Sequence, residues 1–256
     1  MLKEERQERI LEYINKNGKA SVEELLIKYK VSKPTILRDL GQLERKSLIY
    51  RAHGGALSLS NLLSNELPYS EKKLMNTKEK KVIGEMAAQF VDDGDVIIID
   101  AGSTTLEFAK QLSNKRIKVI TNDIRIGLEF SNYRNADLLI PPGKLVKSLY
   151  TLKGMDTAEY FKNILVDKVF LGADAIDLNS GLYNFEEDES YLKRCMIRAS
   201  NQVFVLADKK KFDIKTFSKV CEIEDVNYFI TDYVSKDKIE FLENKGIKVV
   251  SKNQPR

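Results

Sequence analysis

The chain has 256 residues, 43% of them hydrophobic and 31% charged, and carries a formal net charge of +4 at pH 7. This composition is ordinary for a soluble globular protein, and the length leaves room for a small domain joined to a larger one. No run approaches the roughly 18 apolar residues of a membrane helix, and the charged start MLKEERQERILEY lacks the apolar core of a secretory signal. We therefore expect a cytoplasmic protein without membrane contact, in which Cys195 and Cys221 are reduced thiols.

The N-terminal residues predict two helices before a third, more basic one. The first is expected over residues 3–17 and should end at Gly18, because glycine favours the position after a helix. Ser21 opens the sequence SVEE, a capping-box pattern in which the Ser and Glu side chains satisfy free backbone amides at a helix start. After a turn, Ser32 is expected to cap the third helix, which tolerates Pro34 in its first turn.

The third helix, expected over residues 33–46, has two chemically different faces. Ile36, Leu40 and Leu43 recur at helical spacing and are expected to face a core. The opposite face is polar and basic, and it carries Thr35, Arg38, Gln42 and Arg45. Side chains of this kind on one helix can reach base edges and phosphates in the major groove of DNA.

A short strand and a glycine pair follow in the sequence YRAHGGAL. Leu48 and Ile49 predict the first strand of a wing, and the paired glycines predict its tight turn. Residues 1–57 hold 12 Lys and Arg against 8 Asp and Glu, so they carry the whole formal charge excess of the chain. We therefore predict a winged helix-turn-helix domain over residues 1–57 that binds double-stranded DNA. The predicted contact residues are Ser32, Lys33, Thr35, Arg38, Gln42, Arg45, Arg51 and His53.

A segment rich in Ser and Asn, residues 58–77, is expected to be a linker. Beyond it, helical patterns alternate with runs of β-branched residues, beginning with a helix at 78–91. Strands are expected at 96–100, 118–121, 136–140, 168–171, 203–207, 228–231 and 248–250. Such alternation predicts an α/β domain over residues 78–256, built on a mainly parallel sheet with helices on both faces.

The sequence DAGSTT, residues 100–105, directly follows the first of these strands and opens a helix. Gly102 permits a ligand to approach the backbone closely, and the hydroxyls of Ser103, Thr104 and Thr105 would lie beside free amides at the helix start. Such a loop suits a phosphate, while the carboxylate of Asp100 suits sugar hydroxyls. The alternative is an ordinary Ser/Thr-rich helix start with a loop glycine.

Polar groups also follow four other predicted strands, at the sheet edge where open α/β sheets bind ligands. Taken singly, each is better explained as a turn residue or a solvated charge, but five such loops on one edge favour a binding site. The predicted ligand-binding residues are Asp100, Gly102, Ser103, Thr104, Thr105, Asn122, Lys144, Asp174 and Lys211.

Metal binding and nucleophilic catalysis have little support in the composition. His53 is the only histidine, so no histidine-based metal cluster or catalytic triad can form. We expect no cofactor. The acidic run EEDE, residues 186–189, is most simply a solvated helix start, where negative charge suits the helix dipole.

The chain resembles the DeoR family of bacterial transcriptional regulators over nearly its whole length. Its winged helix resembles that of the family in ERQERILEYI, VSKPTILRDLGQLE and YRAHGGAL, and its second domain does so in DAGSTT, VITND, VDKVFLGADAID and LADKKKF. The resemblance implies a sensor domain similar to ribose-5-phosphate isomerase, in a repressor of a sugar-metabolism operon that is controlled by a phosphorylated sugar effector. A homo-oligomer is expected, because paired domains read half-sites on DNA.

The chain departs from the family's pattern at two positions and from that of the isomerase at two more. Leu37 precedes a single Arg38 where two adjacent arginines are usual, and Pro142 replaces the first of a glycine pair. The isomerase-like string has Ala175 in place of Glu, and Lys193 stands where that enzyme has its general base. A lysine does not easily replace a carboxylate as a proton-abstracting base, so we expect binding without catalysis. The alternatives are a sugar-phosphate isomerase with an appended regulatory domain and an adaptor whose winged helix binds protein.

Overall fold

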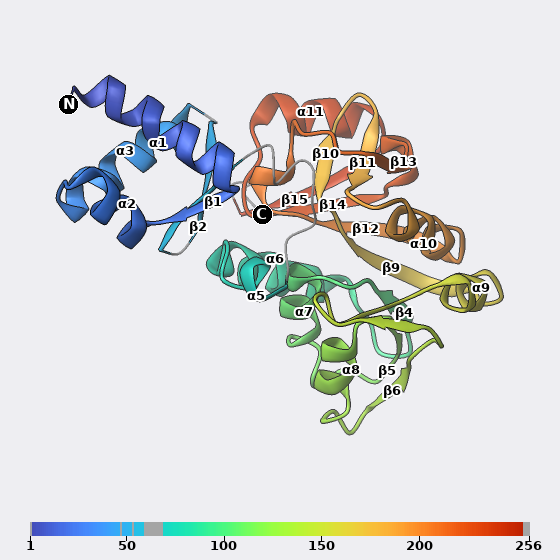
Figure 1. Cartoon of the computed structure of the whole chain (residues 1–256). Helices are drawn as coiled ribbons and strands as arrows, with labels where there is room; N and C mark the ends of the chain where they lie inside the picture. The colour runs from blue at the N-terminus through green and yellow to red at the C-terminus, as the bar shows by residue number, and fades with distance from the viewer. Residues whose placement is uncertain (1, 47, 53, 59–68, 253–256) are drawn as a thin grey trace. The chain divides into compact units, whose positions relative to one another are not determined.

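The structure of the protein, a computed structural model, describes residues 2–46, 48–52, 54–58 and 69–252. The chain divides into two compact units, Met1–Leu67 and Pro68–Arg256, and each is described by itself (Figure 1). The division falls inside the segment expected to be a linker. His53, which we predicted to contact DNA, lies outside the described residues.

The first unit is a winged helix-turn-helix, in which three helices pack with a small antiparallel sheet. Its elements are α1 (Lys3–Asn17), β1 (Lys19–Ser21), α2 (Val22–Tyr29), α3 (Lys33–Arg45), β2 (Ile49–Ala52) and β3 (Gly55–Ser58). The sheet has the order β1-β3-β2, and both pairings are antiparallel. The predicted helices and wing are confirmed, and β1 adds a strand that the sequence pattern did not predict.

The ends of the first three helices differ in how well the sequence predicted them. Gly18 adopts the left-handed conformation after α1, with φ of 76°. Ser21 and Glu24 form the predicted capping box, in which the backbone N–H of Glu24 donates to the Ser21 hydroxyl at 3.1 Å. Ser32 makes no capping bond at the start of α3, and its hydroxyl instead lies 2.9 Å from the hydroxyl of Thr35.

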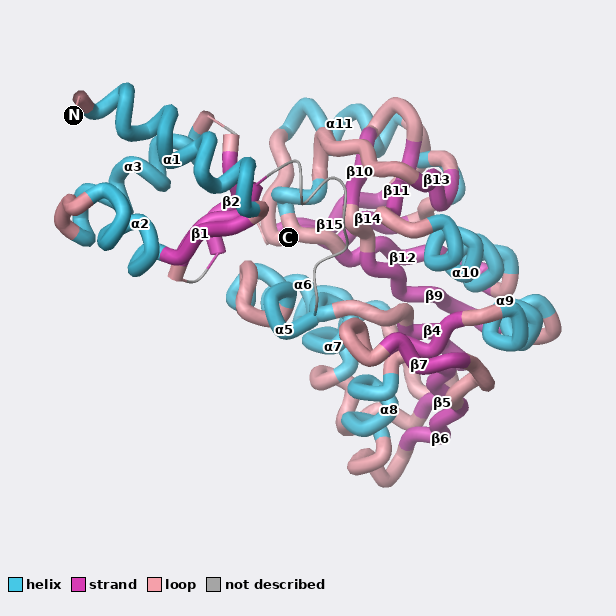
Figure 2. The backbone as a smooth tube through the Cα atoms, viewed as in Figure 1, coloured by secondary structure: helices cyan, strands magenta, loops and turns pink. Residues whose placement is uncertain are grey.

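The second unit is built on a seven-stranded parallel sheet in the order β15-β14-β12-β9-β4-β5-β6 (Figures 1 and 2). The sequence pattern predicts all seven strands, so the expected fold class is confirmed. Their bounds are β4 (Val96–Ile99), β5 (Ile117–Ile120), β6 (Ala136–Leu139), β9 (Val166–Gly172), β12 (Ser200–Leu206), β14 (Tyr228–Thr231) and β15 (Lys248–Ser251). The main helices are α6 (Thr77–Ala87), α7 (Ser103–Ala109), α8 (Ile124–Phe130), α9 (Met155–Lys162), α10 (Glu187–Arg198) and α11 (Lys236–Asn244).

Both faces of this sheet are buried, as the continuous apolar runs in its strands predict. Successive strand residues point to opposite faces. Ile97 and Phe204 belong to a core formed with α6, α7 and α8, whereas Ile98 and Val205 belong to a core formed with α9, α10 and α11. The large sheet is therefore a rigid platform, and its carboxyl edge holds the loops considered below.

Two small antiparallel sheets accompany the large one, and the sequence pattern did not predict them. One pairs β7 (Lys144–Val146) with β8 (Thr151–Lys153). The other contains β10 (Ala175–Asp177), β11 (Gly181–Asn184) and β13 (Ser218–Cys221) in that order. The pairing of β11 with β13 joins segments far apart in the chain, which local periodicity cannot reveal.

The segment between the two units differs from the expected linker. Residues 59–68 lie outside the described residues, but α5 (Tyr69–Lys72) is a short helix within the range expected to be linker. The helix expected at 78–91 begins one residue earlier and ends at Ala87, followed by the 3-10 turn η1 (Ala88–Phe90).

Candidate functional site

The helix α3 exposes basic side chains among those predicted to contact DNA. Lys33, Arg38 and Arg45 are exposed, and Thr35 is half-buried in the first turn. Exposed cations along one helix of a winged helix-turn-helix can neutralise phosphates and reach base edges.

Gln42 is placed differently from what a helical wheel of α3 predicts. Its Oε1 accepts a hydrogen bond from Nε2 of Gln7 at 2.6 Å, and the same Gln7 nitrogen donates to Oδ1 of the buried Asp39 at 3.0 Å. Arg6 completes the cluster with its Nε 2.6 Å from Oδ2 of Asp39. Gln42 and Asp39 therefore tie α3 to α1, and the carbonyl oxygen of Gln42 already accepts one hydrogen bond within the first unit.

Arg51 also has a role within the first unit. Its side chain is half-buried, and Nη1 donates to the backbone carbonyl of Leu37 at 3.2 Å. This bond holds strand β2 against the middle of α3. The wing and the exposed face of α3 are thus joined by a side chain that we predicted only as a DNA contact.

In the second unit, the DAGSTT loop connects the carboxyl end of β4 to α7. The backbone N–H of Gly102 donates to Oδ2 of Asp123 at 3.3 Å, and the hydroxyl of Thr105 donates to the carbonyl of Gly102 at 3.1 Å. Thr105 is buried, whereas Ser103 and Thr104 are half-buried. Thr105 therefore closes the loop internally, and Ser103 and Thr104 offer the hydroxyls with accessible surface.

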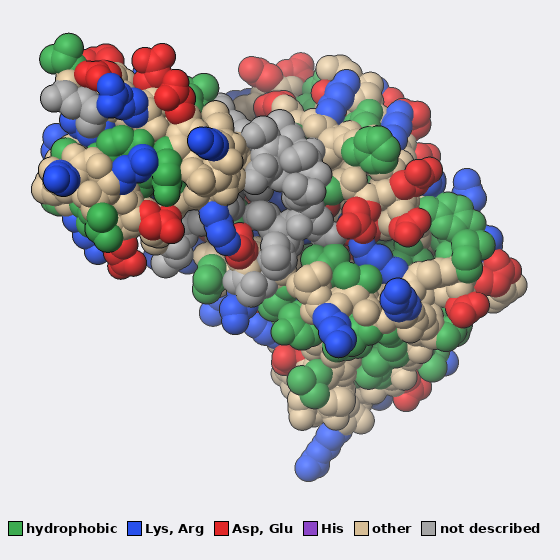
Figure 3. Space-filling model, viewed as in Figure 1, with side chains coloured by type: hydrophobic (Ala, Val, Ile, Leu, Met, Phe, Trp, Pro, Cys, Tyr) green, Lys and Arg blue, Asp and Glu red, His purple; other side chains and the backbone are tan. Residues whose placement is uncertain are grey.

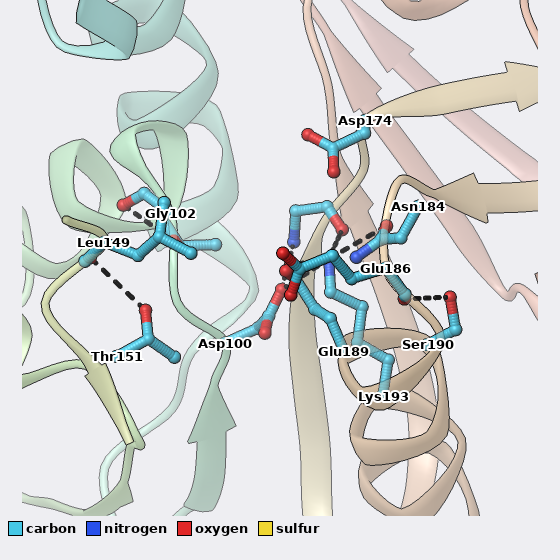
Figure 4. A network of polar contacts seen from close by, with 12 residues as sticks. Asp100, Gly102, Leu149, Thr151, Asp174, Asn184, Glu186, Glu189, Ser190 and Lys193 are labelled. Carbon is cyan, nitrogen blue, oxygen red and sulfur yellow. Dashed lines mark hydrogen bonds and ion pairs between the residues drawn. The ribbon is translucent and has the colours of Figure 1, made fainter. Parts of the chain in front are cut away.

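A buried ion pair begins at the first residue of this loop. Nζ of Lys193 lies 3.1 Å from Oδ2 of Asp100, and both side chains are only 3% exposed (Figure 4). Lys193 also donates to the carbonyl of Gly172 at 2.7 Å and to Oδ1 of Asn184 at 3.4 Å. Burial disfavours the charged form, but the carboxylates of Asp100 and Glu189 outweigh burial and raise the pKa of Lys193 above its ordinary value. The ammonium is therefore charged at neutral pH and already surrounded by acceptors.

Two carboxyl groups at this edge of the sheet have pKa values shifted in opposite directions. Burial raises the pKa of Asp100 to about 6, in spite of the nearby charge of Lys193. Burial alone would also raise the pKa of Asp174, but the charges of Lys72, Lys211 and Lys193 lower it to about 2. The ammonium of Lys72 lies 3.1 Å from Oδ1 of Asp174. Asp174 is therefore a carboxylate at neutral pH, held among cations.

Three buried polar atoms at this edge have no hydrogen-bond partner among the described residues. They are Oδ1 of Asn122, Oδ2 of Asp174 and Nδ2 of Asn184. Asn122 is 1% exposed and Asn184 is fully buried. Because leaving such an atom unpaired costs about 1–3 kcal/mol, these atoms indicate where a ligand can supply the missing bonds. A hydroxyl both donates and accepts, so it suits this combination of acceptors and a donor.

Two further lysines that the sequence analysis missed add positive charge here. Lys72 belongs to α5, in the range expected to be linker, and Lys80 is buried on α6. Nζ of Lys80 donates to the backbone carbonyl of Lys72 at 2.5 Å, and burial lowers the pKa of Lys80 to about 8. The predicted Lys211 is half-buried on the 3-10 turn η2 (Lys209–Lys211).

The β7–β8 hairpin contributes a different lysine from the predicted one. Lys144 is exposed on β7, opposite Lys153 of β8. Nζ of Lys153 lies 3.1 Å from carboxylate oxygens of both Glu186 and Glu189. Lys153, rather than Lys144, is therefore the lysine of this hairpin that forms ion pairs with α10 and the residue before it.

One expectation from the sequence is wrong at Glu189. The acidic run 186–189 was expected to be solvated, and Glu187 and Asp188 are indeed exposed. The side chain of Glu189 is only 12% exposed and lies 3.5 Å from Nζ of Lys193, at i,i+4 spacing on α10. The i,i+4 spacing in the sequence could have predicted that Glu189 pairs with Lys193. It could not predict that both face the sheet, because tertiary packing decides which side of α10 is buried.

Several classes of site are not represented in the part of the chain that the structure describes. There, no three His, Cys, Asp or Glu side chains are arranged to hold a metal ion, and no helix is both long and apolar enough to cross a membrane. Cys195 and Cys221 are free and buried, and burial raises the pKa of both thiols, to about 12 for Cys221. Both are therefore protonated at neutral pH and poor nucleophiles.

Comparison with known proteins agrees with this architecture. Residues 75–233 match the family described as the DeoR C terminal sensor domain, and residues 6–61 match the DeoR-like helix-turn-helix domain. The chain is 34% identical to the uncharacterized HTH-type transcriptional regulator YulB of Bacillus subtilis, over 98% of this chain and 97% of that protein. It is 32% identical to the lactose phosphotransferase system repressor of Lactococcus lactis, over 83% of this chain and 84% of that protein. The solved structure of ribose 5-phosphate isomerase A from Methanocaldococcus jannaschii is similar with a TM-score of 0.40 and 21% identity, over 54% of this chain and 55% of the isomerase.

Proposed function

This chain belongs to the DeoR family of transcriptional regulators, and from that membership we propose that it represses a sugar-metabolism operon. In this proposal, residues 1–57 bind an operator in double-stranded DNA, residues 78–256 bind a phosphorylated sugar, and residues 58–77 join the two. The sugar changes the affinity for DNA because it binds one state of the protein more tightly than another.

The exposed cations of α3 support DNA binding. Arg38 and Arg45 are exposed, and the N-terminal 57 residues carry the whole charge excess of the chain. By contrast, residues 58–256 hold equal numbers of basic and acidic side chains, and these are intermingled on the face of the second unit seen in Figure 3. Electrostatic attraction to phosphates is therefore assigned to the winged helix.

A titration at several salt concentrations tests this assignment. Full-length protein is added to a labelled duplex taken from upstream of its own gene, and to a duplex of shuffled sequence. Phosphate contacts predict a steep loss of affinity with salt, with a slope of roughly −0.9 per phosphate neutralised. Failure to bind either duplex in dilute buffer would contradict the proposal and favour the protein-binding adaptor.

The carboxyl edge of the large sheet supports a phosphorylated sugar as effector. The main support for a sugar is the set of unpaired buried atoms on Asn122, Asp174 and Asn184. Hydroxyl groups of a ligand can form hydrogen bonds with these atoms. Lys72 and Lys211 place positive charge beside Asp174, and the half-buried Ser103 and Thr104 lie at a loop that suits a phosphate. A ligand with both hydroxyls and a phosphate matches this edge.

Thermal unfolding of the full-length protein tests the effector class. Sugar phosphates, the same sugars without phosphate, and inorganic phosphate are compared at equal concentration. A specific ligand stabilises by mass action, by about 2.7 kcal/mol at a hundred times its Kd, so only a phosphorylated sugar should raise the Tm markedly. An equal rise in Tm with free sugar and with sugar phosphate would contradict the proposal that Lys72, Lys211 and the DAGSTT loop bind a phosphate.

We also propose that the second unit binds its ligand without turning it over. The ammonium of Lys193 is held by Gly172 and Asp100 and its pKa is raised, so it cannot accept a proton at neutral pH. An aldose–ketose isomerase assay on the unaltered protein separates this proposal from the isomerase alternative, since measurable turnover would overturn it.

The assembly and location follow from the same family membership. We propose a homo-oligomer in the cytoplasm, because a repressor that reads two half-sites needs two winged helices. Sedimentation of the purified protein with and without duplex checks this, and a monomer bound to DNA would contradict it.

A further inference from the structure

Arg125, at the start of α8, is held between a carboxylate and an aromatic ring. Its Nε donates to Oδ1 of Asp123 at 2.8 Å, and its Nη2 donates to the second oxygen of the same carboxylate. On the other side, the guanidinium carbon lies 3.4 Å from the centroid of the Tyr69 ring and 5.4 Å from that of Tyr150. Arg125 therefore joins α5 to the loop after β5 by two interactions that both need its planar cation.

Asp123 is at the same time a partner of the DAGSTT loop. It is fully buried, and its Oδ2 accepts the backbone N–H of Gly102 at 3.3 Å. This is a long bond, which an anion bound at the loop can replace. The chain of contacts thus runs from Gly102 through Asp123 and Arg125 to the ring of Tyr69.

Each end of α5 makes a further polar contact. Lys72 pairs with Asp174 at 3.1 Å, and the N–H of Tyr69 donates to the carbonyl of Ser148 at 3.0 Å. A four-residue helix has little stability of its own, so α5 depends on tertiary contacts such as these. It is also the first described element after the boundary between the two units.

We propose that Arg125 is a positioning residue that ties α5 to the Gly102 loop, so that effector binding there is transmitted to the segment leading to the winged helix. The inference rests on the proposed function. An anion that accepts the Gly102 N–H displaces Oδ2 of Asp123, the Asp123–Arg125 pair shifts together, and Tyr69 loses its cation. The contacts of α5 then differ between the free and the bound protein. Such a difference between two states is what couples effector binding to DNA binding.

Hydrogen exchange of the full-length protein without ligand provides the first test. The amides followed are Gly102 and Lys73, which donates to the carbonyl of Tyr69 at 2.8 Å. Arg125→Gln and Tyr69→Leu are each expected to raise exchange at Lys73 roughly 3- to 30-fold, the range of a partly buried cation–π contact. Arg125→Lys, which keeps the charge but not the paired bonds, should give a smaller rise at Lys73.

The decisive amide in this test is Gly102 in Tyr69→Leu. The polar contacts that link Tyr69 to Gly102 run through Arg125 and Asp123, so a rise there of about threefold or more supports the inference, and no rise overturns it. Tyr69→Phe keeps the ring and is expected to match the unaltered protein. Arg116→Gln is the matched control, because Arg116 pairs with Asp93 on the surface at 3.2 Å and should leave both amides unchanged.

The second test measures coupling with glucose 6-phosphate, fructose 6-phosphate, glycerol 3-phosphate and inorganic phosphate as probes. For the probe that most weakens DNA binding of the unaltered protein, calorimetry first gives the probe Kd of the unaltered protein and of Arg125→Gln, and DNA binding of each is then measured at a probe concentration that saturates it. In Arg125→Gln, the ratio of DNA Kd values with and without that probe should fall at least tenfold. An unchanged ratio overturns the inference. If no probe binds the unaltered protein, the proposed effector loses support, while the exchange at Gly102 still decides the role of Arg125.

Discussion

The ammonium of Lys193 lies 3.1 Å from the carboxylate of Asp100, at a place where each side chain is only 3% exposed. The contact joins α10 to the end of β4, two elements far apart in the chain. Because neither charge is in water, removing Lys193 leaves the buried side chains of Asp100 and Glu189 without the cation that both contact. The ion pair therefore links the stability of the second unit to its proposed binding site.

Replacement of this lysine is expected to destabilise the second unit. Lys193→Met removes the charge and leaves Asp100 beside Glu189, so the free energy of unfolding in urea should fall by about 3–5 kcal/mol. Lys162→Met is the control, since Lys162 pairs with Glu159 on the surface and its loss should leave the midpoint unchanged. A similar midpoint for both variants would show that the buried pair is not structurally important.

The raised pKa of Asp100 predicts a stability that falls as pH rises. In the unfolded chain this carboxyl titrates near 3.8, and in the folded protein its pKa is about 6. Between these values the folded state holds a proton that the unfolded state has lost, so the stabilisation is complete below pH 4 and disappears as pH rises through 6. Relative to Asp100→Asn, the unaltered protein should lose about 2–3 kcal/mol over this range. The free energy of unfolding of both proteins is measured by urea titration at each pH. The same dependence on pH in both would contradict the raised pKa of Asp100.

Asp174 is expected to act in the opposite direction at lower pH. Its folded pKa is about 2, below the ordinary 3.8. Its contribution is therefore present above pH 4 and is lost as pH falls through 2. Asp174→Asn should be less acid-sensitive than the unaltered protein over this range, which circular dichroism at graded pH can measure. Equal acid sensitivity would argue against a carboxylate held among cations.

Replacement of Asn184 is expected to abolish ligand binding with little effect on stability. Its Nδ2 is buried without a partner, and its Oδ1 accepts a long 3.4 Å bond from Lys193, so these effects oppose each other and Asn184→Leu should change the free energy of unfolding by less than about 1 kcal/mol. Stabilisation by a sugar phosphate should be lost in the same variant. Asn227→Leu provides the contrast, because Oδ1 of Asn227 accepts the N–H of Val203 at 2.7 Å and its removal should cost about 1 kcal/mol. If Asn184→Leu is the more destabilised variant, its amide has a structural role.

Arg38 and Gln42 are expected to differ in their effects on DNA binding. Arg38→Ala should weaken binding to the operator by about 1–3 kcal/mol and relax sequence selectivity. Gln42→Ala should mainly lower stability, by about 1 kcal/mol, because Gln7 loses its 2.6 Å acceptor. Footprinting and thermal unfolding of both variants separate the two effects. Unchanged footprints for Arg38→Ala would remove Arg38 from the contact set.

Local features of this fold could be predicted from the sequence because short-range interactions produce them. The capping box of Ser21 lies within four residues, and the apolar run that becomes β4 needs only its own neighbours to form a strand. The amphipathic pattern of α3 likewise predicts a buried face with Ile36 and Leu40, and both are fully buried. The pairing of β11 with β13 could not be predicted, because these two strands are distant from each other in the chain.

The amino-acid sequence by itself determined the three helices of the first unit, the seven strands of the large sheet, the charge of the first 57 residues and the family. These depend on local periodicity, composition and motif spacing. Only the tertiary structure decided that Gln42 binds Gln7, that Glu189 turns inward, and that Lys193 meets Asp100. The physical reason is that burial and charge pairing depend on which distant segments pack together, and the pKa of a carboxyl is set by that environment rather than by its neighbours in the chain.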